Sequence, residues 1–318
     1  MTLIFFKKEM RNAFVKSIID LAEEDERVFL LVADIGTYLL REFKMRFPKR
    51  FINVGIAEAN MIGVAAGLAM TGKIPFVYTI TPFVTARCLD QIRVDVCYQN
   101  LNVRIVGVGS GISYGRGGPT HHSLTDIAIM RALPNMTVVS PSDPMETEKL
   151  IKATGRYSGP VYIRLPLAGD PVIHQEDYSF SIGKAEFIRE GKDLALIGNG
   201  VMVYHALRIA RLFGIEWKSS AVLNMHTIKP IDKEAILKVA SEIPLIATIE
   251  EHSILGGLGS AVAEVLAENS FQGIFRRFGF QDQFCSQYGE KGELYEQYGI
   301  SSHNIFKNLS SLLGVQNR

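Results

Sequence analysis

The sequence predicts an α/β protein with two doubly wound domains, each built on a mainly parallel sheet. Short apolar segments alternate with segments of helical periodicity, and this alternation occurs in two series. The apolar segments are hydrophobic almost throughout, which is typical of parallel strands covered by helices on both faces. A stretch rich in proline and glycine, 166–192, separates the series. We therefore expect domains at 1–165 and 193–318, joined by this linker.

The first domain is expected to contain six strands, at Val28–Val32, Phe51–Val54, Ile74–Tyr78, Val103–Val108, Thr137–Val139 and Val161–Ile163. Helical patterns fall between them, at 8–24, 58–70, 83–99, 124–132 and 144–155. The last of these helices has a clear start. Asp143 is a favoured cap, Pro144 suits the first helical position, and Glu146 completes a capping box.

The second domain repeats the pattern on a smaller scale. Strands are predicted at Leu194–Ile197, Ser219–Leu223, Leu245–Ile249 and Phe275–Phe278. Helices are predicted at 201–213, 232–241, 257–268 and 300–309. The linker has weak periodicity, so we expect irregular structure there or a hairpin.

Composition excludes several classes of function. Hydrophobic residues make up 47% of the 318 residues and charged residues 21%, as in ordinary globular proteins, and the formal net charge is +1. This balance does not favour binding to nucleic acid or to an anionic membrane. The cysteines Cys88, Cys97 and Cys285 lack metal-ligand spacing and suit a reducing compartment. Without a recognisable signal peptide or a membrane-spanning segment, the predicted compartment is the cytoplasm.

Glu58 lies in the most informative segment of the chain. The predicted strand Phe51–Val54 ends at Gly55, and Glu58 then falls in the first turn of a helix. Open α/β sheets bind ligands in the crevice beyond such strand ends. Gly63 and Gly67 lie one turn apart on this helix, so another backbone can approach closely there. The alternative is structural, because an acidic residue also stabilises the positive end of the helix dipole.

Three further stretches near strand ends can complete a site with Glu58. Phe83 stands where a strand gives way to a helix, either as core or as a flat face for a ligand ring. A glycine-rich loop then leads to His121 and His122. A capping box formed by Ser123 and Asp126 would place both histidines before a helix, whose dipole favours the neutral imidazole. Such an imidazole can exchange protons, whereas a metal site or a solvated histidine pair are the alternatives.

Arg164 closes the apolar strand at the end of the first domain. An arginine at that position is unusual for a buried strand. It can bind an anionic group on a substrate, or it can pair with a carboxylate across the domain boundary.

The residues described above resemble a known family. The specific motifs are Val54–Glu58, Gly117–His121, Met130–Asp143 and Glu250–Gly259. In order and spacing they resemble the C-terminal half of transketolase-like, thiamine-diphosphate-dependent enzymes, over nearly the whole chain. The likeness is greatest to split transketolases, whose two halves are separate polypeptides, and 1-deoxyxylulose-phosphate synthase is a near relative. The resemblance implies a pyrimidine-binding domain followed by a transketolase C-terminal domain.

The resemblance also implies roles for individual residues. Glu58 matches the glutamate that bonds to N1′ of the cofactor's aminopyrimidine and favours its imino tautomer. Phe83 matches an aromatic residue that packs on the pyrimidine. His121 matches a histidine that contacts the donor sugar, and Arg164 an arginine that binds a substrate phosphate. Asp34, Ile56 and Arg87 match other residues of the cofactor pocket.

Two departures from the family pattern bear on substrate choice. The family loop usually reads Gly-Glu-Asp-Gly-Pro-Thr-His, whereas this chain has Arg116 and Gly117 in place of the two acids. The change removes an acceptor for a donor hydroxyl and adds a cation. We therefore expect an altered donor or acceptor, with an anionic group near Arg116. Ile80 replaces a common aromatic residue but leaves Phe83 in place.

The resemblance further implies that this chain holds half of an active site. The family's other half supplies a Gly-Asp-Gly motif and a later Asn that bind Mg²⁺. No such motif occurs here, because Gly198-Asn-Gly200 lacks the acid and falls in the second domain. We expect a separate N-terminal subunit that carries the Mg²⁺ ligands, an α₂β₂ assembly, and weak or no cofactor binding by this chain alone.

The predicted function is ketol transfer: a two-carbon unit passes from a ketose, phosphorylated or otherwise anionic, to an aldehyde. One alternative is the β subunit of a 2-oxoacid dehydrogenase or a synthase of the deoxyxylulose-phosphate type. Gly118–His121 and Arg164 favour the transketolase. A non-catalytic scaffold subunit is the alternative from another class.

Overall fold

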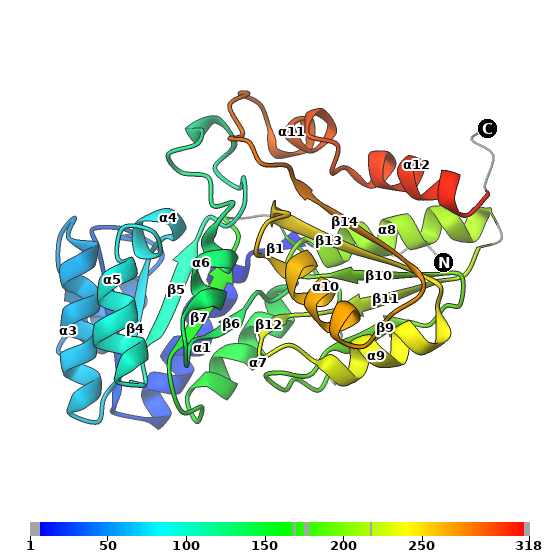
Figure 1. Ribbon diagram of the computed structural model, residues 1–318. Helices are drawn as coiled ribbons and strands as arrows, with labels where there is room; N and C mark the ends of the chain where they lie inside the picture. Colours follow the sequence, from blue (N-terminus) through cyan, green and yellow to red (C-terminus); the bar gives the residue numbers. More distant parts are fainter. Residues whose placement is uncertain (1–6, 168–169, 175–177, 217, 315–318) are drawn as a thin grey trace.

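The computed structural model describes residues 7–167, 170–174, 178–216 and 218–314. These residues form two α/β domains that lie side by side (Figure 1), one on a seven-stranded sheet and the other on a five-stranded sheet. The predicted fold class is confirmed. None of the helices within the described residues is long and apolar enough to cross a membrane.

The first sheet has the strand order β12-β6-β7-β5-β4-β2-β3. Its strands are β2 (Val28–Val32), β3 (Phe51–Asn53), β4 (Ile74–Ile80), β5 (Arg104–Val108), β6 (Thr137–Val139), β7 (Val161–Leu165) and β12 (Thr227–Lys229). All neighbours are parallel except β12, which runs antiparallel to β6. Since β12 comes from the second half of the sequence, the two domains share this edge.

Helices cover both faces of the first sheet, as continuously apolar strands predict. They are α1 (Met10–Glu24), α2 (Arg41–Arg46), α3 (Glu58–Met70), α4 (Thr81–Val84), α5 (Leu89–Gln91), α6 (Asp126–Ala132) and α7 (Pro144–Thr154), with a π-helix at Ile92–Tyr98 and a 3₁₀ turn at Gly115–Gly117. In β2, Leu30 and Val32 pack in the same core cluster as α1 and α7. Leu31 packs in the cluster that contains α3, so successive residues serve opposite faces.

Three local predictions for the first domain need correction. β3 is a half-exposed edge strand rather than a buried one, since it pairs with β2 alone. The expected helix at 83–99 is broken into α4, α5 and the π-helix. Asp143 caps α7 by accepting from the N–H of Glu146 at 2.8 Å, but the Glu146 carboxylate bonds to the N–H of Ser142 instead of closing a capping box.

The second sheet has the order β14-β13-β10-β11-β9. Its strands are β9 (Glu186–Arg189), β10 (Leu194–Gly198), β11 (Ser220–Asn224), β13 (Leu245–Ser253) and β14 (Ile274–Phe280). β9 comes from the expected linker and adds an antiparallel edge. The helices are α8 (Met202–Ile215), α9 (Lys233–Glu242), α10 (Leu258–Glu268), α11 (Lys291–Gln297) and α12 (Ser302–Leu312), the last capped by Ser301.

The expected linker is fastened to both domains. Its β8 (Asp170–Pro171) pairs with β1 (Lys7–Lys8) of the first domain. His174 lies between two carboxylates, with Nε2 2.6 Å from Glu186 Oε2 and Nδ1 3.1 Å from Asp143 Oδ2. Burial opposes the charged form, but these carboxylates outweigh it and raise the pKa of His174 to about 10. A charged His174 therefore ties the first part of the expected linker to the cap of α7 and to its later segment β9, which belongs to the second sheet.

Candidate functional site

The candidate residues of the first domain gather at one edge of its sheet. β3, β2, β4, β5 and β7 are neighbours in that order and all run parallel, so their carboxyl ends meet at the same edge. The predicted residues follow these ends: Asp34 after β2, Ile56 and Glu58 after β3, Phe83 and Arg87 after β4, and Arg116 and His121 after β5, while Arg164 lies within β7. This edge is where open α/β sheets bind their ligands.

Glu58 is the first residue of α3 and is only 3% exposed. Its position at the positive end of the helix dipole stabilises the carboxylate. Arg87, whose side chain is 47% exposed, donates from Nη1 to Glu58 Oε2 at 2.8 Å. A buried carboxylate with a partner that reaches it from the surface is suited to bind a polar ligand group.

A series of side-chain contacts leads from Glu58 through Arg87 and Phe83 to the glycine-rich loop. The guanidinium of Arg87 lies over the Phe83 ring, 4.2 Å from its centroid. The Phe83 ring meets the His121 ring edge-on at 5.4 Å between centroids. On its other side, His121 lies 5.4 Å from the ring of Tyr114. The sequence predicted Arg87, Phe83 and His121 as site residues. It did not predict Tyr114, which belongs to the same glycine-rich loop as His121.

The two adjacent histidines differ in their surroundings. His121 is half-buried between the rings, and its Nδ1 lies 2.9 Å from Thr120 Oγ1. His122 is buried, and its Nε2 lies 2.9 Å from the carbonyl oxygen of Gly115. Burial lowers the pKa of His122 and so favours the neutral imidazole. Only His121 faces Phe83.

The prediction that Ser123 and Asp126 form a capping box is wrong. The helix α6 begins at Asp126, and its cap position is occupied by Thr125 without a side-chain bond. Asp126 instead turns into the core, where its Oδ2 lies 2.7 Å from Arg164 Nε and accepts from the hydroxyl of Tyr162 at 2.7 Å. The pair with Arg164 keeps the pKa of Asp126 below its usual value despite the opposing effect of burial.

The Arg164 side chain is enclosed by the protein. It is 3% exposed, and its Nη2 donates to the carbonyl oxygens of Ser123 at 3.1 Å and Glu251 at 2.9 Å. Glu251 belongs to β13 of the second domain, so the bond to its carbonyl oxygen joins the two domains. The carboxylate that pairs with Arg164 is that of Asp126, which lies in the first domain. Because the guanidinium is enclosed and already bonded, the structure favours a structural role for Arg164 over the expected binding of a substrate phosphate.

Asp34 and Ile56 lie on the exposed side of the same edge. Asp34 has a positive φ of 50°, and its N–H and carboxylate both bond to the Asn53 side chain, at 3.1 and 3.3 Å. The bonds fix the turn after β2. Ile56 is 79% exposed, two residues before Glu58, which leaves its side chain available to a ligand or a second chain.

Arg116 stands at the outer part of the glycine-rich loop and is fully accessible. Its guanidinium pairs with Glu290 at 3.0 Å, and both side chains are more than 70% exposed. Exposed pairs of this kind contribute about 0–1 kcal/mol. An incoming anion can therefore displace Glu290 at little cost.

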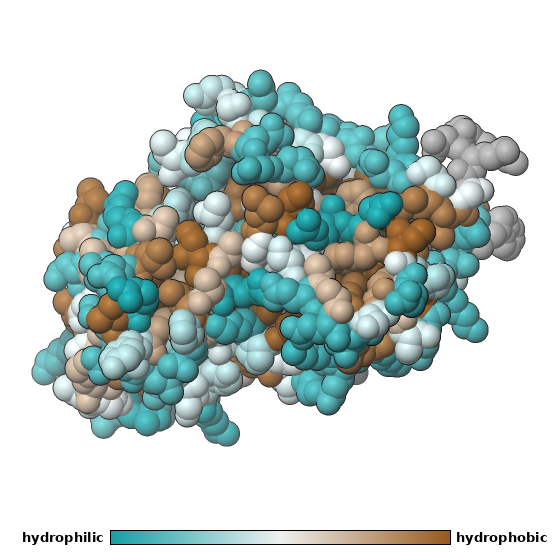
Figure 2. Space-filling view, viewed as in Figure 1, coloured by the Kyte–Doolittle hydropathy of each residue, from teal (hydrophilic) through white to brown (hydrophobic). Residues whose placement is uncertain are grey.

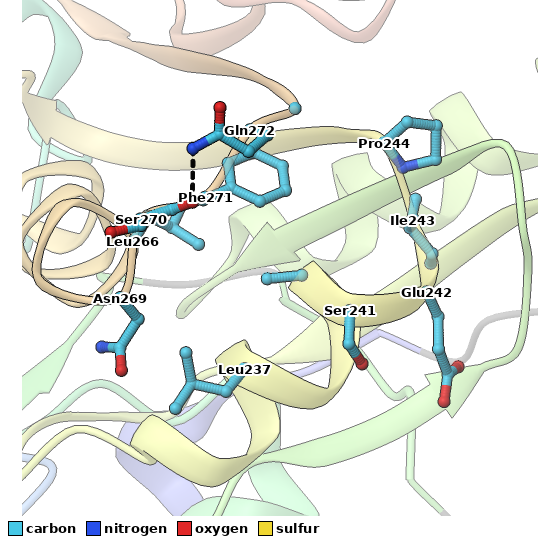
Figure 3. Close-up of a pocket in the computed structure, with 12 residues that line it drawn as sticks. Leu237, Ser241, Glu242, Ile243, Pro244, Leu266, Asn269, Ser270, Phe271 and Gln272 are labelled. Atoms are coloured by element: carbon cyan, nitrogen blue, oxygen red, sulfur yellow. Dashed lines mark hydrogen bonds between the residues drawn. The ribbon is translucent and has the colours of Figure 1, made fainter.

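A separate hollow of about 730 Å³ lies in the second domain (Figure 3), between the last turns of α9 and α10. Apolar side chains such as Leu237, Leu266 and Phe271 line it, and Glu242 is its one ionisable residue. It lies before the first residues of β13 and β14, away from the carboxyl ends of these strands. Among the described residues, no cluster of three or more His, Cys, Asp or Glu side chains is placed to hold a metal ion.

Comparisons with known proteins agree with this architecture. The family model of the transketolase pyrimidine-binding domain matches residues 7–168, and that of the transketolase C-terminal domain matches residues 183–305. An apulose-4-phosphate transketolase subunit of Phocaeicola vulgatus is 39% identical, over 93% of this chain and 95% of that protein.

Two further comparisons cover almost the whole chain. The 6-deoxy-6-sulfo-D-fructose transketolase subunit of a Clostridium species is 40% identical, over 94% of this chain and 92% of that one. A solved structure of a split-gene transketolase, described as an inactive β4 tetramer, is 36% identical and superimposes with a TM-score of 0.87, over 97% of this chain and 99% of that one.

Replacing Arg164 by methionine is expected to lower the free energy of unfolding by about 3–5 kcal/mol, because it leaves the Asp126 carboxylate buried without its partner. Urea denaturation measures this change. The matched variant Arg116→Met breaks an exposed pair and is expected to cost no more than about 1 kcal/mol. Equal losses for the two variants would contradict the structural role assigned to Arg164.

Proposed function

The chain belongs to the transketolase family, and we propose that it is the C-terminal subunit of a thiamine-diphosphate-dependent transketolase. In this proposal, the enzyme transfers a two-carbon ketol unit from a ketose to an aldehyde. The observation that carries the proposal is the buried Glu58 at the start of α3, in a row with Arg87, Phe83 and His121. The three free cysteines are buried, which fits a reducing cytoplasm.

The side chains at this edge fit the aminopyrimidine of thiamine diphosphate. Glu58 would hold the ring through its carboxylate, and Phe83 would pack against it. Arg87 fixes the carboxylate from the solvent side, and Ile56 offers an exposed apolar surface beside it. When bound, thiamine diphosphate supplies the nucleophilic carbon and the electron sink needed to break a carbon–carbon bond next to a ketone.

The chain's own residues bind, orient and move protons. Glu58 would share a proton with a ring nitrogen of the cofactor, and its burial makes that hydrogen bond stronger than it would be in water. A glutamine cannot take this role because it has no acidic proton. His121, held between Phe83 and Tyr114, would exchange a proton with a substrate oxygen.

A second polypeptide would complete the site. Met70, Leu89 and Tyr98, on α3, α5 and the π-helix, are exposed. On the α3–α5 side of the first domain, Figure 2 shows brown atoms among teal ones. A Cβ at Gly63 or Gly67 would meet nothing within 4 Å, so the outer face of α3 is open to another chain. We propose an N-terminal subunit that brings the diphosphate and Mg²⁺ ligands, in an α₂β₂ assembly.

The substrate is proposed to carry an anionic group that reaches Arg116. The loop offers this exposed guanidinium next to Gly117, in place of the two acids of the usual motif. Two relatives are named for a sugar phosphate and a sulfosugar, both of which carry an anionic group. The negative charge of these two sugars is complementary to the Arg116 guanidinium, which supports an anionic ketose as donor.

Glu58→Gln is expected to lower ketol-transfer turnover by at least about 100-fold, because glutamine cannot share an acidic proton with the cofactor nitrogen in the transition state. The measurement uses the complex of this chain with its N-terminal subunit. Glu146→Gln is the matched control, since Glu146 is equally buried in the first domain but bonds to Ser142 and Asn224.

The control is expected to lose stability while keeping its turnover within a few-fold per folded complex. Turnover of Glu58→Gln within a few-fold of wild type would exclude the proposed role. A scaffold function would then be the better account of this chain.

Arg116→Gln is expected to raise KM about tenfold for a ketose that carries phosphate or sulfonate, since one charge-assisted hydrogen bond is lost. KM for a neutral ketose is expected to stay unchanged. Glu290→Gln is the companion variant, and by freeing Arg116 it is expected to leave KM for the anionic ketose equal or lower. Parallel changes for both ketoses would exclude charge recognition by Arg116.

A further inference from the structure

Glu251 of the second domain lies against the base of the glycine-rich loop of the first. It belongs to β13 and is 1% exposed. Its Oε1 accepts a hydrogen bond from the N–H of Ile112 at 3.3 Å. The loop that carries Tyr114 and His121 thus begins at a carboxylate from the other domain.

Gly111 shows how closely the carboxylate and the loop fit together. This glycine has a φ of +59°, a conformation that other residues rarely adopt. A Cβ built on Gly111 would lie 2.2 Å from Cδ of Glu251, so the carboxylate occupies the space of a side chain. The backbone turns there because a glycine leaves room for Glu251.

The second domain holds Glu251 firmly in place. The hydroxyl of Tyr295 donates to Oε1 at 2.6 Å, and Lys291 Nζ lies 3.3 Å from the same oxygen. From the first domain, Arg164 also donates to the carbonyl oxygen of Glu251 at 2.9 Å. The contacts of the carboxylate converge on Oε1, so displacing it would break several of them at once, and Glu251 can act as a fixed reference point for the loop.

The geometry of the loop transmits this position to His121. The N–H of Ser123 donates to the carbonyl oxygen of Gly111 at 2.7 Å, which closes the loop at its base. The residue after His121, His122, bonds back to Gly115 within the loop. A shift at Gly111 would therefore move both ends of the segment on which His121 is carried.

We propose that Glu251 is a positioning residue for His121, and that the second domain supports the reaction through it. The contacts of the Glu251 carboxylate with the first domain are at the backbone of Ile112 and Gly111, and we infer that it acts through them. The proposed effect of Glu251 on catalysis rests on the function proposed above, whereas its proposed effect on the position of the loop does not.

The adjacent Glu250 is a matched control. It is also fully buried, and its carboxylate also stands where a glycine lacks a side chain, 2.0 Å from a Cβ built on Gly257. It accepts from the N–H groups of Leu258 and Gly259 at 2.7 and 2.9 Å, so it holds the start of α10 in its own domain. The two glutamates differ in which domain they hold.

Hydrogen–deuterium exchange on the full chain tests the hold on the loop without an activity assay. Glu251→Gln is expected to speed exchange in residues 109–123 about tenfold, the factor that one charge-assisted hydrogen bond is worth. Tyr295→Phe removes one hydroxyl and keeps the fold, and it is expected to speed exchange in these residues to a smaller extent. Glu250→Gln is expected to change exchange at the start of α10. Unchanged exchange in 109–123 for Glu251→Gln, or an equal change for Glu250→Gln, would overturn the proposal.

Kinetics of the two-chain complex test the consequence. Glu251→Gln is expected to lower kcat about 10- to 100-fold with a smaller change in KM, as for a misplaced catalytic group. In a His121→Ala background the same substitution is expected to have less than about a twofold effect, because Glu251 acts through His121. An equal loss in both backgrounds would mean that Glu251 acts only through stability. A wild-type complex without ketol transfer would refute the proposed function, while the exchange experiment still decides whether Glu251 holds the loop.

Discussion

The buried ion pair between Asp126 and Arg164 is the interaction on which the rest of the site depends. Two charges in an interior without water are tolerated only when their remaining hydrogen-bonding groups are satisfied. Tyr162 completes the carboxylate, and the carbonyl oxygens of Ser123 and Glu251 complete the guanidinium. These partners come from β7, from the start of α6, from the end of the glycine-rich loop and from β13 of the second domain. Satisfying one pair of charges thus fixes all these segments relative to one another, and His121 is positioned as a result.

Glu58 is held by a simpler arrangement that leaves the site open on one side. A carboxylate at a helix start needs little support beyond the dipole and one cation, which Arg87 provides. Phe83 is only half-buried and Ile56 is exposed, so this chain alone encloses the pyrimidine edge incompletely. A reaction that must exclude water needs further walls. We infer that the second chain supplies them, along with the ligands of the diphosphate.

The sequence predicted those features that depend on local patterns. The helix start at Glu58, the Asp143 cap and the parallel strands follow from periodicity and capping within a few residues, and the structure contains them. It failed where a distant partner decides. Asp126 has the spacing of a capping box, but its carboxylate pairs instead with the buried guanidinium of Arg164, far along the chain. The Glu251 contact with the loop and the crossing of β12 to the first sheet are also long-range, and no local pattern marks them.

The central claim is that this chain carries one half of a thiamine diphosphate site. Calorimetric titration of thiamine diphosphate with Mg²⁺ into this chain, into the N-terminal subunit and into their mixture tests it most directly. The account predicts weak or no binding to this chain alone and tight, Mg²⁺-dependent binding to the mixture. Tight, Mg²⁺-dependent binding to this chain by itself would contradict it.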